Sequence, residues 1–373
     1  MSSDDALPRA DQAPGAPHPR ETLRLFGQES AEQEFLSAFN SDRMHHGWLI
    51  TGPQGIGKAT LAWRIARFLL ATPQDDGGLF GAPPPPTNLG IDPDHPVSHR
   101  IQALAEPGLA AITRSYNDRE KLRDQIVVDD IRALNRFFGL SSADGGRRVV
   151  VVDAADDMNT SAANALLKML EEPPERTTLL LISHQPSRLL PTIRSRCRTL
   201  RLTPLNPVDM QSALNQAGVE VTEGSEHLNA LAQGSVGQAI RLLSLGGLEI
   251  YSEWVQILAS MPRLDRARAL KLSEAAAMPG AGAKFELLLT LIETSLARLA
   301  RTGATGQPPL PEAAAQEAET LMRLAPHPAK GRAWADLAAT ASARSRHGQA
   351  VNLDPAALVL DTVFKMQDTA SRP

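Results

Sequence analysis

Short apolar runs alternate with helical stripes over the first half of the chain. Five of these runs have the length of buried strands: 48–50, 126–128, 149–152, 179–182 and 199–202. Helical spacing appears between them, first at Leu61, Ile65, Phe68 and Leu69. A later stripe comprises Ile131, Leu134 and Phe138, with Asp129 or Asp130 expected to cap its helix. The alternation predicts an α/β domain, a parallel sheet flanked by helices, over residues 21–204.

The second half of the chain has a different pattern. From residue 208 onward helical stripes dominate, and no run is typical of a strand. The clearest stripe consists of Phe285, Leu288, Leu289, Ile292 and Leu296. We therefore predict two helical domains after the α/β domain, one over residues 205–262 and the other over residues 263–373.

Two segments interrupt this pattern. Residues 1–20 are rich in Pro, Ala and Asp, and this composition predicts a disordered lead-in. Residues 73–100 contain a Gly-Gly pair and four consecutive prolines, which predict an irregular insertion at the surface of the α/β domain.

Composition narrows the class of protein. The 373 residues include 38 Lys and Arg against 42 Asp and Glu, so the formal net charge is 38 − 42 = −4. This balance argues against a protein that coats DNA. The single cysteine excludes an internal disulfide framework and a zinc module built from several cysteines. Because no apolar run reaches the ~20 residues of a membrane span and the N-terminus lacks a signal peptide's apolar segment, we expect a soluble cytoplasmic protein without membrane contact.

A glycine-rich segment follows the first predicted strand: Gly52-Pro-Gln-Gly55-Ile-Gly57-Lys58. In a phosphate-binding P-loop, glycines let backbone N–H groups close on the phosphates, and the lysine reaches the terminal ones. A plain glycine-rich turn is the other interpretation, and the lysine at this spacing between a strand and a helix favours the P-loop. Ala59 occupies the position of the Mg²⁺-binding hydroxyl, and Thr60 comes one residue late. We therefore expect ATP binding at this site to be weak or absent.

An acidic residue, Asp153, ends the run 149–152. P-loop folds place the acid that orients Mg²⁺ at the end of such a buried strand. An ATP-hydrolysing protein of the AAA+ class carries a glutamate directly after this acid, and here that position is Ala154. The carboxylates at 153, 156 and 157 are equally typical of the start of a helix. The missing hydroxyl and the missing glutamate together predict that the chain does not hydrolyse ATP by itself.

Arginines are concentrated between residues 188 and 201, where five of them occur without an acid: Arg188, Arg194, Arg196, Arg198 and Arg201. An exposed basic loop is the ordinary meaning of such a run. The functional interpretation is a guanidinium offered to a phosphate held by another molecule. Charge alone leaves both interpretations open.

Several motifs together resemble those of the delta-prime subunit family of the bacterial DNA polymerase III clamp loader, a family of AAA+ proteins. The matching segments are Gly52–Lys58, the stretch Asn164-Ala-Leu-Leu-Lys-Met-Leu-Glu-Glu-Pro-Pro174, Ser195-Arg196-Cys197, Gly234-Ser-Val-Gly237 with Arg241 and, more weakly, residues 351–355. The second and third segments in combination are specific to clamp-loader ATPase folds. The resemblance covers residues 25–243 well and the remainder thinly.

This resemblance implies a role for each matching residue. Arg196 would be an arginine finger that acts in trans, on ATP bound by a neighbouring motor subunit. The residues Gly52, Gly55, Gly57, Lys58 and Thr60 would belong to the remnant of a nucleotide site, with Asp153 as its Walker B acid and Arg241 as the sensor arginine of a helical lid. The last helical domain would join an oligomeric collar.

The resemblance also implies partners. They are the motor and delta subunits of the complex and, through it, the sliding clamp and primer-template DNA. The chain would then be a stator in the ATP-dependent loading of the clamp. Two other hypotheses stay open: a catalytically active AAA+ ATPase of the motor type, and an interaction protein that has lost nucleotide binding.

The chain departs from many relatives in one further respect. They carry a four-cysteine zinc module where this chain has its Pro-rich insertion, so we expect no zinc. His95 and His99 are interpreted as exposed loop residues, and no other metal site is expected. Cys197 is interpreted as a small packed residue, since no activating His–Asp arrangement is evident near it.

Overall fold

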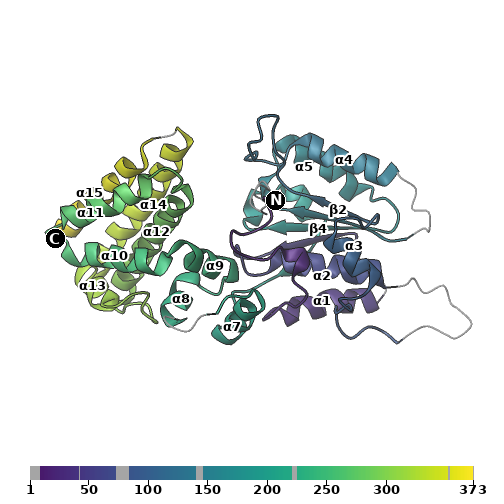
Figure 1. Cartoon of the computed structure of the whole chain (residues 1–373), viewed down its shortest axis with the longest axis horizontal. Coiled ribbons are helices and arrows are strands. Elements are labelled where there is room, and N and C mark those ends of the chain that lie inside the picture. The colour runs from purple at the N-terminus through teal and green to yellow at the C-terminus, as the bar shows by residue number, and fades with distance from the viewer. Residues whose placement is uncertain are drawn as a thin grey trace, which may run out of the picture. The chain divides into compact units, whose positions relative to one another are not determined.

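The chain forms two compact units in the computed structural model, which describes residues 9–41, 43–72, 84–139, 146–220, 225–351 and 353–372. The N-terminal unit comprises residues 1–219 and 234–237, and the C-terminal unit comprises residues 220–233 and 238–373 (Figure 1). The three-domain boundaries expected from the sequence stay a prediction.

A five-stranded parallel sheet forms the centre of the N-terminal unit. Its strands are β1 (Gly47–Thr51), β2 (Leu109–Ile112), β3 (Arg148–Asp153), β4 (Thr177–Ser183) and β5 (Arg198–Arg201), in the spatial order β2-β3-β4-β1-β5. Every residue of β1 and β4 is buried, as expected for parallel strands covered on both faces. The predicted α/β fold, a parallel sheet with flanking helices followed by a helical region, is confirmed.

The register of the sheet brings the carboxyl ends of its strands to one edge. Thr51 at the end of β1 lies opposite Ser183 of β4 and Arg201 of β5. Asp153 at the end of β3 lies opposite Ile182. Open parallel sheets bind their ligands at this edge, which makes it the place to look for a site.

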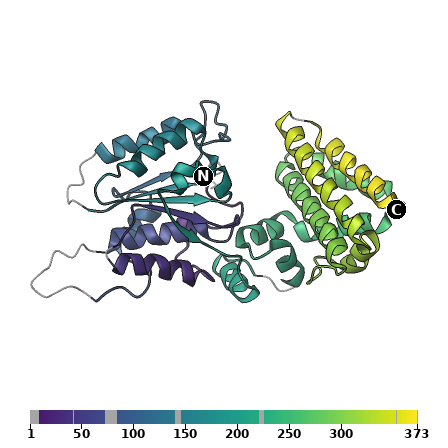
Figure 2. The same ribbon diagram turned by 180° about the vertical axis from the view of Figure 1, so that it is seen from behind.

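Helices cover both faces of the sheet. On one face lie α4 (Val128–Gly139) and α5 (Thr160–Glu171), and on the other α1 (Glu29–Asn40), α2 (Lys58–Ala71) and α3 (Pro96–Gln102) (Figures 1 and 2). Two further α-helices are α6 (Pro191–Arg194) and α7 (Pro207–Gln216), and short 3₁₀ turns occupy Pro19–Glu21, Ala155–Asp157 and Pro186–Arg188. The predicted stripe from Leu61 to Leu69 is buried on α2.

One predicted strand is wrong and one strand was not predicted. Ile126 forms only an isolated bridge with Met158, and α4 already begins at Val128. The Asp130 carboxylate accepts the Val127 N–H at 2.8 Å, which satisfies a backbone donor at the start of the helix. The strand that pairs with β3 on the side away from β4 is instead β2, over 109–112.

The N-terminal segment is ordered from residue 9 onward, which corrects the prediction of a disordered lead-in; residues 1–8 lie outside the described part. His18 is 1% exposed, and its ring contacts that of Trp63 edge-on at 5.9 Å. The buried Arg67 guanidinium on α2 donates to the Arg20 carbonyl oxygen at 2.6 Å. The segment therefore packs along α2.

The Pro-rich insertion is partly helical. Helix α3 occupies 96–102, and its residues Val97 and Ile101 are buried against Trp63. His95 caps this helix by accepting the Val97 N–H at 3.2 Å, and His99 lies exposed on it, so neither is a loop residue of the kind predicted. Residues 73–83 lie outside the described part of the chain.

The C-terminal unit contains helices and, among its described residues, no strand. Its helices are α8 (Ser225–Ala232), α9 (Val236–Leu245, whose first residues belong to the N-terminal unit), α10 (Gly247–Ser260), α11 (Arg266–Ala277), α12 (Gly282–Thr305), α13 (Glu317–Leu324), α14 (Pro328–Ala350) and α15 (Pro355–Ser371). The predicted stripe from Phe285 to Leu296 is buried on α12. A Cβ on Gly303 would lie 2.6 Å from the Gly331 nitrogen, so the backbones of α12 and α14 touch there. None of the described helices is long and apolar enough to cross a membrane.

Candidate functional site

The glycine-rich segment connects β1 to α2, as the P-loop interpretation requires. Gly52, Gly55 and Gly57 have positive φ angles of 143°, 77° and 100°, a backbone region in which other residues are strained. A Cβ on Gly52 would also lie 2.8 Å from the Leu202 carbonyl oxygen. The fold of this loop therefore depends on its glycines.

Lys58 turns back into its own loop. Its side chain is buried, and its Nζ donates to the carbonyl oxygens of Gly52, at 2.7 Å, and of Pro53. Burial lowers the pKa of Lys58 to about 8, against the opposing attraction of Asp153 and Asp156. The ammonium group that would meet a terminal phosphate is thus bonded to the backbone of the P-loop itself.

The carboxylates after β3 separate into different environments. Burial raises the pKa of Asp153 to about 7, with a further contribution from Asp11 in the N-terminal segment. Asp156 accepts the backbone N–H groups of His184 and Gln185 at 3.1 Å and so ties the ends of β3 and β4 together. Asp157 lies 3.4 Å from Arg114. Asp153 and Asp156 both act electrostatically on Lys58, and Asp156 and Asp157 are in addition held by structural contacts.

Two polar residues at the end of β4 were not predicted from the sequence. Ser183 Oγ and His184 Nδ1 are buried, and neither has a hydrogen-bond partner in the described part of the chain. Burial lowers the pKa of His184 to about 4, so its imidazole is neutral at physiological pH. The signal was available, since Ser183 and His184 follow the apolar run 179–182 as Asp153 follows the run 149–152. They are the unsatisfied polar atoms of this sheet edge.

The motif Gly234-Ser-Val-Gly237 contacts the P-loop directly. The Gly237 N–H donates to the Gly55 carbonyl oxygen at 3.0 Å, and Ser235 Oγ donates to that of Gln54 at 2.8 Å. A Cβ on Gly55 would lie 3.1 Å from Gly237 Cα, so the two segments require glycine at their contact. Residues matched at widely separated positions in the sequence thus form one structure.

The magnesium-binding groups of a hydrolytic site are not all present. Ala59 packs with the apolar cluster around Trp63, and Thr60 is partly buried on the next position of α2. Ala154 is buried and supplies no carboxylate where hydrolysis needs one. With Lys58 bonded to its own loop, these residues do not fit a Mg²⁺–ATP site of the hydrolysing kind. The described residues also contain no group of three or more His, Cys, Asp or Glu side chains that could hold a metal ion.

The predicted sensor arginine belongs to the other unit. Arg241 lies on α9 beyond the residues that contact the P-loop, and its Nη2 is 3.3 Å from Glu286 Oε2 within the C-terminal unit. The sensor role of Arg241 stays a prediction.

Arg196 follows α6, immediately before β5. Its Nη2 lies 2.9 Å from Glu171 Oε1 at the end of α5, and its Nη1 donates to the Thr192 carbonyl oxygen at 3.1 Å. The side chain is 37% exposed. Arg198 is likewise paired, with Glu34 at 3.3 Å, and it stacks over the Trp48 ring. Its side chain is 42% exposed. Both arginines are thus held in place and still accessible, and Arg196 is the one that belongs to the motif Ser195-Arg196-Cys197.

Cys197 is partly buried and packs against the apolar core that contains Leu170 and Ile193. Burial raises the pKa of its thiol to about 12, which keeps it protonated and supports the interpretation of a packing residue.

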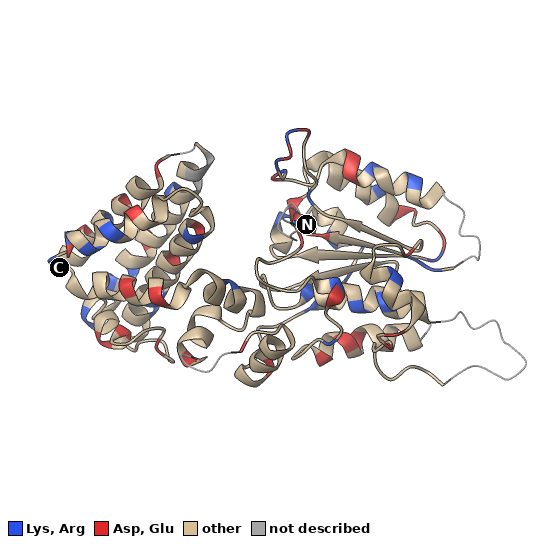
Figure 3. Cartoon of the chain, in the orientation of Figure 1, with Lys and Arg blue, Asp and Glu red and all other residues tan. Residues whose placement is uncertain are grey.

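Figure 3 shows Lys and Arg residues interspersed with Asp and Glu residues on the helices of both units.

Residues 27–206 match the model of a protein family described as "DNA polymerase III, delta subunit". Over this range, which is somewhat less than half of the chain, the chain is similar to that family. A protein of Pseudomonas aeruginosa described as DNA polymerase III subunit delta′ is 39% identical to the chain over 230 residues. The matched region covers 60% of the chain and 64% of that relative, which is less than two thirds of the relative's length.

Solved structures are also similar to the chain. A DNA polymerase III gamma subunit-related protein from Thermotoga maritima is 16% identical, with 90% of the chain and 99% of that protein covered and a TM-score of 0.37. The RuvB Holliday junction branch migration motor of Thermotoga maritima is 17% identical, with 76% and 79% covered and a TM-score of 0.37.

Proposed function

We propose that this chain is a delta-prime type subunit of a clamp loader. It acts as a stator that donates Arg196 to ATP bound by a neighbouring motor subunit, during the loading of the sliding clamp onto primed DNA. Its partners are the motor and delta subunits and, through the complex, the clamp and the primer-template DNA.

The observation that carries this proposal is the contrast between two sites on one unit. At the P-loop, the lysine is buried and bonded to its own backbone, and the hydroxyl and glutamate of a hydrolytic site are replaced by Ala59 and Ala154. At the basic segment, the Arg196 guanidinium is held by Glu171 and Thr192 yet is accessible. A guanidinium supplied from outside stabilises the negative charge that develops on a transferring phosphoryl group.

The test is the DNA-stimulated ATPase of the reconstituted complex with Arg196→Ala. Removal of an arginine finger lowers the hydrolysis rate at the site it serves by on the order of 10³-fold. The total ATPase rate of the complex is therefore expected to fall by the fraction that this site contributes. Arg194→Ala is the matched control, because Arg194 is exposed on the same turn and makes no ion pair among the described residues. An Arg196→Ala complex that assembles and hydrolyses ATP at the wild-type rate would refute the finger role.

The chain's own nucleotide site is proposed to bind ATP weakly or not at all. Two observations support this proposal. Lys58 donates hydrogen bonds to carbonyl oxygens of the P-loop itself, and Asp153 is neutral at pH below about 7. The unsatisfied Ser183 Oγ and His184 Nδ1 favour retention of some polar ligand.

Equilibrium titration of ATP and ADP into the purified chain separates these possibilities. We expect a dissociation constant in the millimolar range or no binding, and an unchanged ATPase of the complex with Lys58→Ala. Micromolar binding that Lys58→Ala abolishes, together with a large loss of clamp loading, would instead make nucleotide at this site functional. ATP hydrolysis by the isolated chain would favour the motor-type alternative.

A further inference from the structure

We infer that Glu171 is a positioning residue for Arg196, which orients the guanidinium toward negative charge presented by a neighbouring subunit. This inference rests on the proposed finger role. It concerns a contact within the chain, the 2.9 Å pair between Arg196 Nη2 and Glu171 Oε1.

The backbone on which both side chains stand is tightly fixed. The end of α5 is joined to the segment before β1, where the ring of His46 contacts the Leu170 carbonyl oxygen at 2.9 Å. A Cβ on Gly47 would lie 2.8 Å from Leu170 Cδ2 and 3.1 Å from the Arg196 carbonyl oxygen. The three segments therefore meet with no room for a side chain at Gly47. The packing of the backbone does not by itself fix the conformation of the long Arg196 side chain.

The two bonds of the guanidinium fix this side chain without using up its donors. Glu171 engages Nη2 and the Thr192 carbonyl oxygen engages Nη1, which accounts for two of the five N–H donors of a guanidinium. Arg196 and Glu171 are 37% and 44% exposed. An ion pair at such exposure adds little to folding stability. Its consequence is orientation, because an arginine held in one rotamer loses less conformational entropy when it meets a phosphate.

Neighbouring residues show that the pair is specific. Glu172 is exposed directly after Glu171 and takes part in no ion pair among the described residues. The other acid near the basic segment, Glu34, is engaged by Arg198. Glu171 is thus the carboxylate that holds Arg196, and Glu172 offers a control with the same chemistry and exposure.

The experiment uses the reconstituted complex with five variants of the chain: Glu171→Gln, Glu171→Ala, Glu172→Gln, Arg196→Ala, and Glu171→Gln combined with Arg196→Ala. Steady-state ATPase is measured against ATP concentration in the presence of primed DNA, with assembly checked by size-exclusion chromatography. For Glu171→Gln we expect kcat to fall by ~3–10-fold with KM unchanged, since a finger acts in the transition state. Glu171→Ala, which also removes the hydrogen-bond acceptor, should lower kcat at least as much. Glu172→Gln should match the wild type.

The outcomes distinguish the two proposals. Positioning requires that Glu171→Gln has no further effect in the Arg196→Ala background. If Arg196→Ala lowers the rate and Glu171→Gln does not, the finger role stands and the positioning role is wrong. A Glu171→Gln complex with a higher kcat would mean that the pair masks Arg196, and this too would overturn the inference. A rate unaffected by Arg196→Ala would remove both proposals.

Discussion

At the scale of single residues, Lys58 and Asp153 show how burial dominates the electrostatics of the P-loop edge. Their opposite charges attract, yet the pKa of Lys58 is lowered to about 8 and that of Asp153 is raised to about 7. In both cases burial is the largest cause, because the charged form loses its hydration. Three other carboxylates, Asp11, Asp156 and Asp157, raise the pKa of Asp153 further. Near neutral pH this edge therefore carries less charge than its residues suggest.

The raised pKa of Asp153 predicts a pH-dependent stability. An unfolded aspartate has a pKa of about 3.9, so between pH 4 and 7 the folded chain binds more protons at this residue than the unfolded chain. The free energy of unfolding therefore falls as pH rises through this window. Asp153→Asn removes the ionising group, and the variant should be more stable than the wild type at pH 8 by on the order of 2 kcal/mol. Denaturant unfolding at several pH values measures this difference.

The pH profile of that difference decides the cause. It should be small at pH 4, grow up to about pH 7 and then level off. Asp124→Asn is the control, because Asp124 is exposed. A stability difference for Asp153→Asn that is constant over pH would show that the side chain acts through packing instead.

At the scale of elements, long apolar runs were predictable and marginal ones were not. The apolar runs that form β1, β3 and β4 are buried on both faces, so their composition alone identifies them as strands. The edge strand β2 has the sequence Leu-Ala-Ala-Ile and only its last residue is buried, which gives no comparable signal. Residues 126–128 have strand composition, but a strand also needs a ladder partner, and only Ile126 finds one.

The N-terminal segment shows a second limit of local reasoning. Its composition is that of a disordered chain, but its order comes from contacts with α2, some forty residues later in the sequence. His18 and Arg20 are polar residues that are buried because they pack against Trp63 and Arg67 on α2. No local pattern contains that information.

Residues of the candidate site could be predicted where they belong to a sequence motif. They could not be predicted where the fold alone places them beside the motif. The P-loop glycines and Lys58 follow β1, and Asp153 at the end of β3 is near enough to Lys58 to raise its pKa against the effect of burial. Ser183 and His184 join them because β4 is the strand between β1 and β3 in the sheet, and strand order is not written in any one segment. The pairing of Arg196 with Glu171 likewise depends on α5 ending beside α6.

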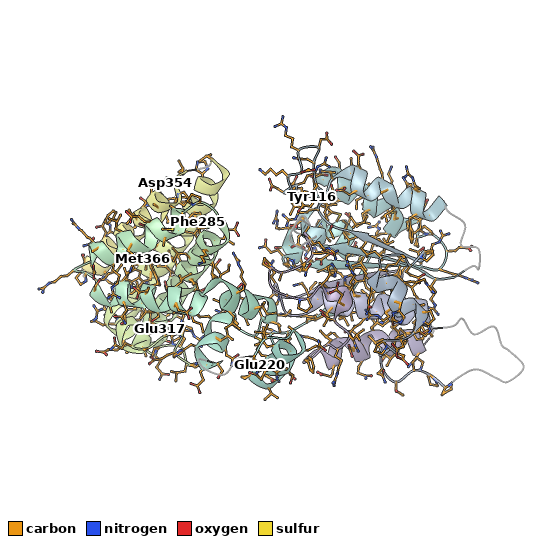
Figure 4. All side chains as sticks on the ribbon, in the orientation of Figure 1. Tyr116, Glu220, Phe285, Glu317, Asp354 and Met366 are labelled. Carbon is orange, nitrogen blue, oxygen red and sulfur yellow. The ribbon has the colours of Figure 1, made fainter. Side chains whose placement is uncertain are left out.

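At the scale of the whole molecule, each unit has a core of its own with a different character. Trp48 and Trp63 are buried in the N-terminal unit, and Trp254 and Trp334 in the C-terminal unit. The C-terminal core also contains a buried charged network around Glu317, a residue labelled among the helices in Figure 4. Its carboxylate accepts from Arg298 at 2.7 and 2.8 Å, from Tyr251 Oη at 2.6 Å and from the Ala313 N–H at 2.6 Å. Burial and the nearby Glu317 charge raise the pKa of Tyr251, so its hydroxyl remains a donor.

This network predicts a destabilisation confined to one unit. Glu317→Gln leaves the buried Arg298 guanidinium without a counter-charge and replaces one acceptor by a donor, a change that costs about 3–5 kcal/mol. Hydrogen exchange measured by mass spectrometry should show faster exchange in α10, α12 and α13 and unchanged exchange in the sheet of the N-terminal unit. Glu319→Gln is the matched control, since Glu319 is exposed on the same helix. Equal protection in the two variants would mean that the charge of Glu317 is dispensable, whereas faster exchange in β1 and β4 would mean that the two cores unfold together.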